Sequence, residues 1–295
     1  MRRCAFLTLD DPSAYVIDDE LAYDPLRALG WEVEPVPWRR PGVAWTDYDA
    51  VVIRSTYDYM TAPEAFLAAL GEIERSGTPL LNDLATVRWN VRKTYLRDLA
   101  ARGVPVVPTV WRDRLRPGEL GELLAAAGAA EVVVKPVVGA NAEGAFRLDA
   151  RAAAERAGEI EAWYADRALM AQPFVPAVVD EGEFSLFYFN GEHSHTILKT
   201  PRPADFRVQE EHGGRIRPVR ADAPLLAAGA AALRAIGGAP LYARADFVRA
   251  NGGDGFWLME LELIEPSLYL RMDEGAPQRF ARAIHARSTQ VIATP

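Results

Sequence analysis

Two glutamates, Glu260 and Glu262, lie in the otherwise apolar stretch 257–266. Alternate residues of a β-strand face opposite sides, so these carboxylates share one face, roughly 7 Å apart, flanked by Leu258 and Ile264. The opposite face is expected to be apolar and to carry Trp257, Met259, Leu261 and Leu263. Paired carboxylates on such a strand are costly unless a cation or hydrogen-bond donors neutralise them. Their spacing suits a pair of metal ions about 3.5–4 Å apart.

The preceding strand carries Arg244 and Asp246, and a loop rich in Gly, Asn and Asp joins the two strands as a hairpin. A turn centred in this loop would place Asp246 opposite Glu260. Arg244 would then lie opposite Glu262, although a one-residue slip would separate these side chains. Three carboxylates suit hard cations, and a guanidinium suits a phosphate. The alternative is a surface hairpin with solvated acids, but the Arg-x-Asp at hairpin distance and the apolar opposite face favour a metal site.

Length and composition restrict the function classes. The chain has 295 residues, enough for two or three subdomains, and its formal net charge of -8 argues against nucleic-acid and anionic-membrane partners. The single cysteine, Cys4, excludes an intrachain disulfide and a cysteine-based zinc site, and it fits a reducing cytoplasm. No long apolar run follows Met1, so neither a signal peptide nor a membrane span is expected.

Residues 1–83 alternate predicted strands and helices, which is typical of a small open parallel sheet. Ligands of such sheets sit beyond the carboxyl ends of the strands. Arg54, Tyr57 and Asp58 fall at that position, after an apolar strand over residues 49–54. They could hold a polar substrate there. The alternative is that this segment only connects the strand to the following loop and binds no ligand.

A lysine and a loop of small residues mark the middle of the chain. Lys93 is predicted within a long helix over residues 82–102. The strand 131–136 ends on Lys135 and leads into the loop 139–144, Gly-Ala-Asn-Ala-Glu-Gly, before another strand begins. Backbone N–H groups of such a loop can cradle phosphate oxygens, and the lysine can reach the same phosphates. The segment is not a P-loop, because its lysine precedes the loop and no helix follows.

Two further segments could contribute to a ligand site. The apolar strand 168–175 is interrupted by Pro173, and its free backbone groups could bind a purine edge. Residues 183–199 read as a hairpin turning on Asn190-Gly191. His193, His195 and Lys199 would share one face of that hairpin. The histidines are metal-ligand candidates by type, but no third His or Cys lies nearby, which favours a structural or substrate-adjacent role.

The order of these features resembles that of the ATP-grasp ligases. Those enzymes carry a lysine in a helix, a Lys-Pro strand end, a glycine flap, an apolar hinge, an Arg-x-Asp and a late Glu-x-(Asn/Glu)-x-x-x-Pro strand. The resemblance covers about residues 83–275 and favours the glutathione synthetase and ribosomal-protein glutamate ligase branch. Segments 54–59, 89–96, 189–195 and 198–201 look like those of the cycloserine-forming O-ureido-serine cyclo-ligase group.

The resemblance implies an α/β (α+β) protein with an ATP-grasp fold behind an N-terminal open parallel sheet. It implies a substrate-binding pre-ATP-grasp domain at 1–83, a central lid subdomain at 84–172 and a catalytic subdomain at 173–295. The implied ATP-binding residues are Lys93, Lys135, Gly139, Ala140, Asn141, Gly144, Gln172, Phe174, Val175 and Glu183. The implied magnesium ligands are Asp246, Glu260 and Glu262, and the implied catalytic residues are Arg244 and Lys199. The substrate-side candidates are Arg54, Tyr57, Asp58, Arg202 and Arg271.

Two departures from the family pattern stand out. The third metal position is often Asn, and here it is Glu262, whose extra charge favours two divalent ions, Mg²⁺ with Mn²⁺ as a substitute. The flap 139–144 has fewer glycines than many relatives and should be stiffer.

The reaction implied is phosphoryl transfer from ATP to a carboxylate of a small amino-acid-like substrate, followed by attack of an amine on the acyl phosphate. The nucleophile could belong to a second molecule or to the same one, as in cycloserine formation. A nucleotide-binding module without turnover is a further alternative, against which the complete acidic set and both lysines weigh. A dinucleotide-binding oxidoreductase is disfavoured, because no Gly-x-Gly-x-x-Gly follows the first strand. The oligomeric state stays open, with a homodimer as one candidate.

Overall fold

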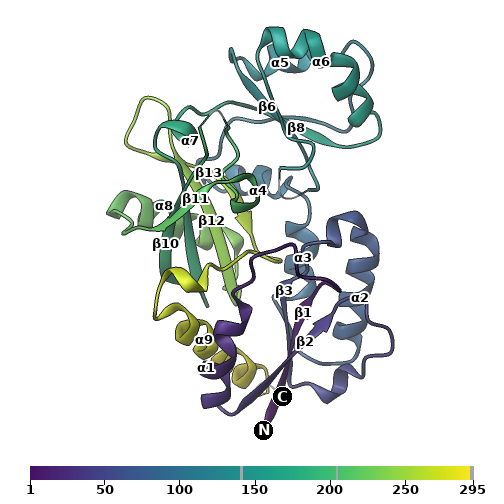
Figure 1. The fold of residues 1–295 in the computed structure, drawn as a ribbon, viewed down its shortest axis with the longest axis vertical. Coiled ribbons are helices and arrows are strands. Elements are labelled where there is room, and N and C mark those ends of the chain that lie inside the picture. Colours follow the sequence, from purple (N-terminus) through teal and green to yellow (C-terminus); the bar gives the residue numbers. More distant parts are fainter. Residues whose placement is uncertain (140–141, 204, 293–295) are drawn as a thin grey trace.

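A computed structural model describes residues 1–139, 142–203 and 205–292. Within these ranges the chain forms three sheets, with strand orders β2-β1-β3-β4, β5-β8-β6-β7 and β11-β10-β9-β12-β13. Figure 1 shows the N-terminal sheet at one end of the molecule, the small second sheet at the other, and the five-stranded sheet between them. No helix within the described ranges is both long and apolar enough to span a membrane.

The N-terminal sheet is parallel throughout, as the alternation of strands and helices predicts. Its strands are β1 (Arg2–Thr8), β2 (Trp31–Pro37), β3 (Ala50–Ser55) and β4 (Leu80–Leu81). Its helices are α1 (Tyr23–Ala28) and α2 (Pro63–Arg75), with 3-10 turns η1 (Asp19–Ala22), η2 (Trp45–Asp47) and η3 (Tyr59–Thr61). Every residue of β3 is buried, because helices pack on both faces of the sheet.

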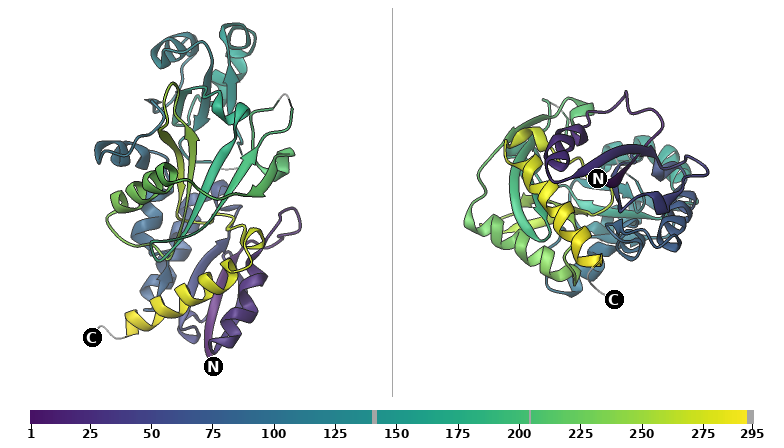
Figure 2. Two further views of the ribbon diagram at one scale, coloured as in Figure 1. Left: turned by 90° about the vertical axis from the view of Figure 1, so that its left-hand side faces the viewer. Right: turned by 90° about the horizontal axis from the view of Figure 1, so that it is seen from below.

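The last helix, α9 (Ala276–Ile292), also packs on the N-terminal sheet. Its Phe280 shares a core with Cys4, Phe6 and Val52, while α2 covers the opposite face of the same sheet. Figure 2 shows α9 lying beside the N-terminal strands. The end of the chain therefore helps to build the core of its beginning.

The small sheet is antiparallel and packs its helices on one face. It comprises β5 (Val110–Arg112), β6 (Val132–Pro136), β7 (Phe146–Leu148) and β8 (Leu169–Pro173), with α5 (Leu120–Ala127) and α6 (Ala150–Trp163). The large sheet is also antiparallel. Its strands are β9 (Glu183–Phe189), β10 (Glu192–Thr200), β11 (Arg215–Pro218), β12 (Tyr242–Arg249) and β13 (Phe256–Glu262). The remaining elements are α3 (Leu84–Asn90), α4 (Tyr95–Ala101), α7 (Ala177–Asp180), α8 (Ala223–Ile236), η4 (Glu210–His212) and η5 (Leu270–Met272).

The predicted long helix around Lys93 is wrong, because α3 ends at Asn90 and α4 begins at Tyr95. The backbone N–H of Lys93 donates to the Val137 carbonyl (2.8 Å), whereas a continuous helix would direct it to Trp89. Lys93 therefore lies in a break between two short helices, next to the strand end that carries Lys135.

The predicted faces of the strand 257–266 are partly wrong, because β13 contains a bulge. Asp246 pairs with Glu260 and Phe247 with Leu258, so Met259 is an extra residue. A bulge shifts the alternation by one position. Leu258 consequently joins Leu261 in the core, and Met259 lines a cavity instead.

A second bulge separates the two histidines of β10, which the prediction placed on one face. His193 pairs with Tyr188 and His195 with Phe187, leaving Ser194 as the extra residue. His195 stacks on Phe187 with ring centroids 4.3 Å apart, and its Nε2–H donates to the Leu268 carbonyl (3.0 Å). His195 is thus a buried structural residue.

Acid should destabilise the protein through His195. Burial lowers its pKa from 6.5 to about 4, so the unfolded chain binds the proton more tightly and stability falls as the pH drops from 6.5 to 4. The loss from this group is about 3 kcal/mol at pH 4. We expect His195→Gln to lose less stability than the natural protein over this interval in urea unfolding. Equal losses in both proteins would contradict the assignment, since His193 titrates in both.

Candidate functional site

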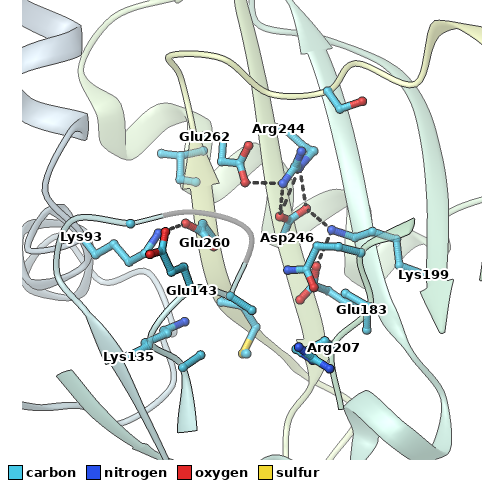
Figure 3. Close-up of a pocket in the computed structure, with 18 of the residues that line it drawn as sticks. Lys93, Lys135, Glu143, Glu183, Lys199, Arg207, Arg244, Asp246, Glu260 and Glu262 are labelled. Atoms are coloured by element: carbon cyan, nitrogen blue, oxygen red, sulfur yellow. Dashed lines mark hydrogen bonds and ion pairs between the residues drawn. The ribbon is translucent and has the colours of Figure 1, made fainter. Parts of the chain in front are cut away.

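A cavity of about 230 Å³ lies where the three sheets meet. Figure 3 shows charged side chains from β6, β9, β10, β12 and β13, and from the connection between α3 and α4, pointing into it. Aromatic residues that follow the carboxyl ends of β1 and β3 close its other side. The site therefore takes residues from segments throughout the chain.

The predicted register of the acidic hairpin is confirmed. Asp246 pairs with Glu260 and Arg244 with Glu262 across β12 and β13, so all four residues line the cavity. The guanidinium of Arg244 joins two of the acids, donating to Asp246 (3.0 Å) and forming an ion pair with Glu262. One cation thus holds two carboxylates together on the wall of the cavity.

Asp246 is the most deeply buried of the three acids, at 2% exposure. Burial opposes its ionisation, but Arg244 and Lys199 outweigh that penalty and lower its pKa to about 2. The Ser185 hydroxyl also donates to its Oδ1 (2.5 Å). Asp246 is therefore a carboxylate at any physiological pH.

Glu260 and Glu262 differ in charge compensation. Burial disfavours the charged form of Glu260, but its ion pair with Lys93 and the proximity of Lys135 lower its pKa. Burial raises the pKa of Glu262 to about 7, because Arg244 only partly offsets it and Glu260 adds repulsion. Of these two glutamates, Glu262 is therefore the one whose charge is less fully compensated.

Lys135 and Lys199 have different surroundings. Lys135, near the end of β6, has no ion-pair partner among the described residues, and burial lowers its pKa. Lys199 pairs with Glu183 (2.5 Å) and lies 3.5 Å from Asp246, and these acids outweigh burial to raise its pKa. The structure therefore leaves Lys135 free to meet an anionic ligand.

The acids fit a hard cation by their chemistry. Asp246, Glu260 and Glu262 offer oxygen donors from adjacent strands, the ligand type that Mg²⁺ prefers. Their carboxylates are held by lysine and arginine in this arrangement. Across the described residues, accordingly, no three His, Cys, Asp or Glu side chains lie close enough together to hold a metal ion. An incoming divalent ion would have to replace Lys93 and Arg244 as the counter-charge.

Most of the predicted nucleotide-side residues line the cavity. Gly139, Gln172, Phe174, Val175 and Glu183 all line it. Val175 and Val178 pack in one apolar cluster with Met259 against them. These residues form a slot with apolar walls, which suits a flat heterocycle.

Three predicted flap residues are not placed in the lining. Ala140 and Asn141 fall outside the described residues. Gly144 is described, but it is not among the lining residues: its carbonyl accepts a hydrogen bond from the Tyr164 hydroxyl (2.5 Å). Its φ of 68° also favours glycine.

Arg54 does not line the cavity. It is 1% exposed, and its guanidinium donates to Asp19 (3.0 Å) and to the Pro266 carbonyl (3.0 Å). Asp58 also lies outside, where it accepts from Trp38 (2.7 Å) and Arg39 (2.9 Å). Neither residue is among those that line the cavity, and a contact of either with the substrate stays a prediction.

Of the other three substrate-side candidates, one lines the cavity and two do not. Tyr57 lines the cavity, as predicted. Arg202 pairs with Asp205 in an exposed loop. Arg271 is not among the lining residues; it forms ion pairs with Asp18 (2.9 Å) and Glu210 (2.5 Å) and so connects two segments that are distant along the chain.

Sequence reasoning missed several lining residues. They include Tyr15, Tyr59, Arg207, Glu265 and Tyr269. Glu265 directly precedes Pro266 in the acidic stretch, and Arg207 lies five positions after the predicted substrate-side residue Arg202, so both had a weak signal. Tyr59 belongs to the segment 54–59 that carries part of the family resemblance, whereas Tyr15 and Tyr269 had no signal, because their place in the lining depends on contacts between distant segments.

Comparison with known proteins identifies the family. A family model described as the N-terminal domain of D-cycloserine synthetase DcsG matches residues 4–82. The cycloserine biosynthesis protein DcsG of Streptomyces lavendulae is 34% identical over 279 residues, which cover 88% of this chain and 90% of that protein. The crystal structure of D-cycloserine synthetase DcsG matches with a TM-score of 0.84 and 32% identity, over 97% of this chain and 99% of that one.

A more distant structure shares the fold. The ATP-grasp ligase PsnB, solved with a minimal precursor, Mg and ADP, matches with a TM-score of 0.64 and 16% identity, over 97% of this chain and 98% of that one. These matches confirm the predicted α/β class and the predicted resemblance. This chain belongs to the ATP-grasp ligases, in the group of the cycloserine biosynthesis protein DcsG, and is an ATP-dependent ligase.

Proposed function

We propose that the enzyme uses ATP to activate the carboxylate of O-ureido-serine, and that a nitrogen of the same molecule then closes the cycloserine ring. The observation that carries this proposal is the cavity itself, whose lining combines the acidic hairpin, several tyrosines and Lys135, for which the described residues provide no ion-pair partner. The similarity to the cycloserine biosynthesis protein supports the choice of substrate.

The nucleotide would lie between the apolar slot and the lysines. Phe174 and Val175 would contact the base, Glu183 the ribose, and Lys93 and Lys135 the phosphates. Asp246, Glu260 and Glu262 would hold two Mg²⁺ ions, or Mn²⁺ in their place, which supply charge neutralisation along the triphosphate when bound. Release of Glu260 from Lys93 would free that lysine for the nucleotide.

The first step forms an acyl phosphate. An oxygen of the substrate carboxylate attacks the γ-phosphorus, the bond from phosphorus to the bridging oxygen breaks, and ADP leaves with the electron pair. Arg244 would stabilise the charge on the transferred phosphoryl group, a contribution that rests on position rather than covalent chemistry. No protein nucleophile is required in this step, because the substrate carboxylate itself attacks the phosphorus.

The second step closes the ring. The nitrogen bonded to the side-chain oxygen attacks the activated carbonyl, loses its proton, and expels inorganic phosphate as the bond from carbon to the phosphate oxygen breaks. The ring then carries the carbamoyl group on nitrogen, and one water converts that group to carbon dioxide and ammonia. The net activation uses one ATP and gives one ADP and one phosphate.

The test is release of ADP and phosphate with Mg²⁺ across a panel of amino acids, with and without added amines. We expect turnover of O-ureido-serine without any amine, and mass spectrometry should find the cyclised product. Turnover that requires a second amine would indicate an intermolecular ligase instead. Absence of ADP release with every compound would contradict the proposal.

A further inference from the structure

Glu265 is an acid in the cavity that the reaction above does not use. It is partly buried and lines the cavity three residues after β13 ends. Glu183, Asp246, Glu260 and Glu262 each form an ion pair, whereas no ion pair within 4.0 Å is found for Glu265 among the described residues. A desolvated carboxyl without a counter-charge is unfavourable unless a ligand supplies one.

The backbone around Glu265 is fixed on both sides. The Tyr242 hydroxyl donates to the Ile264 carbonyl (2.7 Å), and Arg54 donates to the Pro266 carbonyl (3.0 Å). Both donors are buried, at 0% and 1% exposure. The carboxyl is therefore presented from a rigid segment, as a binding group should be.

The immediate surroundings of Glu265 suit an ammonium group. Tyr59 and Tyr57 both lie within electrostatic range of Glu265. Both tyrosines line the cavity, and aromatic rings stabilise a nearby cation. Glu262 and Glu265 both line the cavity, three positions apart along the chain. Burial, with repulsion from Glu262 as the next cause, raises the pKa of Glu265 to about 8.

Glu262 belongs to the part of the site where the substrate carboxylate would be activated. A cationic group bound by Glu265 would therefore lie close to that carboxylate. In an α-amino acid the ammonium and the carboxylate are attached to one carbon, which matches this arrangement. A carboxylic acid without the amino group would leave Glu265 unpaired.

We propose that Glu265 is the counter-ion for the α-ammonium group of the substrate, and that this contact selects α-amino acids over other carboxylic acids. The inference rests on the proposed function, because it places the substrate carboxylate beside Arg244 and Glu262. Arg54, expected from the sequence to touch the substrate, acts here through the backbone as a positioning residue for Glu265.

The test compares O-ureido-serine with its des-amino analogue, 3-(ureidooxy)propanoate, in the natural protein and in Glu265→Gln. We expect Glu265→Gln to lower kcat/KM for the amino compound about 10- to 100-fold, mainly through KM, because a charge-assisted hydrogen bond is lost. The des-amino compound and the KM for ATP should be nearly unaffected. Glu72→Gln, an exposed change on α2, is the matched control.

Calorimetric binding of both compounds separates this inference from the proposed function. If neither compound is turned over but the natural protein still binds the amino compound more tightly, and Glu265→Gln does not, the subsite holds although the proposed reaction fails. An equal loss for both compounds in Glu265→Gln would overturn the inference, as would undiminished preference for the amino compound. Glu265→Asp, which keeps the charge, should retain part of the preference and shows whether loss of folding explains the first variant.

Discussion

Glu260→Gln should reduce Mg²⁺-dependent ADP release by a factor of about 10³ while the protein stays folded, because loss of a metal ligand removes several kcal/mol of charge stabilisation. Glutamine has nearly the same size as glutamate but carries no charge and offers one oxygen. Glu260 lies at the centre of the acidic hairpin, opposite Asp246 and in contact with Lys93. We expect the apparent affinity for Mg²⁺ to fall together with kcat.

The measurement is a magnesium titration of ADP release, with the circular dichroism spectrum as the check on folding. Glu192→Gln, an exposed glutamate at the start of β10, changes the same functional group outside the cavity and should leave both quantities unaltered. Natural rates and natural magnesium dependence in Glu260→Gln would show that the hairpin acids are not the metal site.

The pairing of β12 with β13 was predictable because two kinds of information agree. A Gly-rich turn limits the register of a hairpin to a few choices, and acids beside basic groups favour one of them. The pairs Asp246–Glu260 and Arg244–Glu262 form as predicted, although the bulge at Met259, which periodicity does not predict, lies between them and the turn. Local sequence is sufficient here because the interacting residues are close along the chain.

Periodicity fails where the chain departs from a regular element. The extra residue Met259 turns into the cavity, and Lys93 occupies a break between two helices, because partners elsewhere in the fold determine both. The backbone N–H of Lys93 donates to the carbonyl of Val137, which directly follows β6 and is 44 positions away along the chain. A period counted along one segment contains no information about such partners.

Arg54 shows the same limit for function. Its position at the carboxyl end of a buried parallel strand favoured a place beside the substrate, which stays a prediction. Its partners, Asp19 and the Pro266 carbonyl, are 35 and 212 positions away, and they turn the guanidinium from the cavity into the core. The contact with Pro266 also holds the backbone next to Glu265, and neither role could be inferred from one segment alone.

Arg244→Gln should lower kcat about 10²- to 10³-fold, since an electrostatic donor to a transferred phosphoryl group is lost. The same change should also destabilise the protein without ligand, by about 3 kcal/mol, because Asp246 and Glu262 lose the cation that holds them together. Urea unfolding without magnesium measures the second effect, and rapid-mixing measurement of ADP formation measures the first.

Arg249→Gln is the matched control for Arg244→Gln, since Arg249 lies on the same strand but pairs with Glu181 at 35% and 33% side-chain exposure. Exposed ion pairs contribute at most about 1 kcal/mol, so this variant should keep its rate and nearly all of its stability. If Arg244→Gln lost stability but kept its rate, Arg244 would serve only to hold Asp246 and Glu262 before the nucleotide binds. If Arg244→Gln loses both rate and stability while Arg249→Gln keeps both, the guanidinium of Arg244 has two roles. It neutralises the acids in the free protein, and it neutralises the phosphoryl group during transfer.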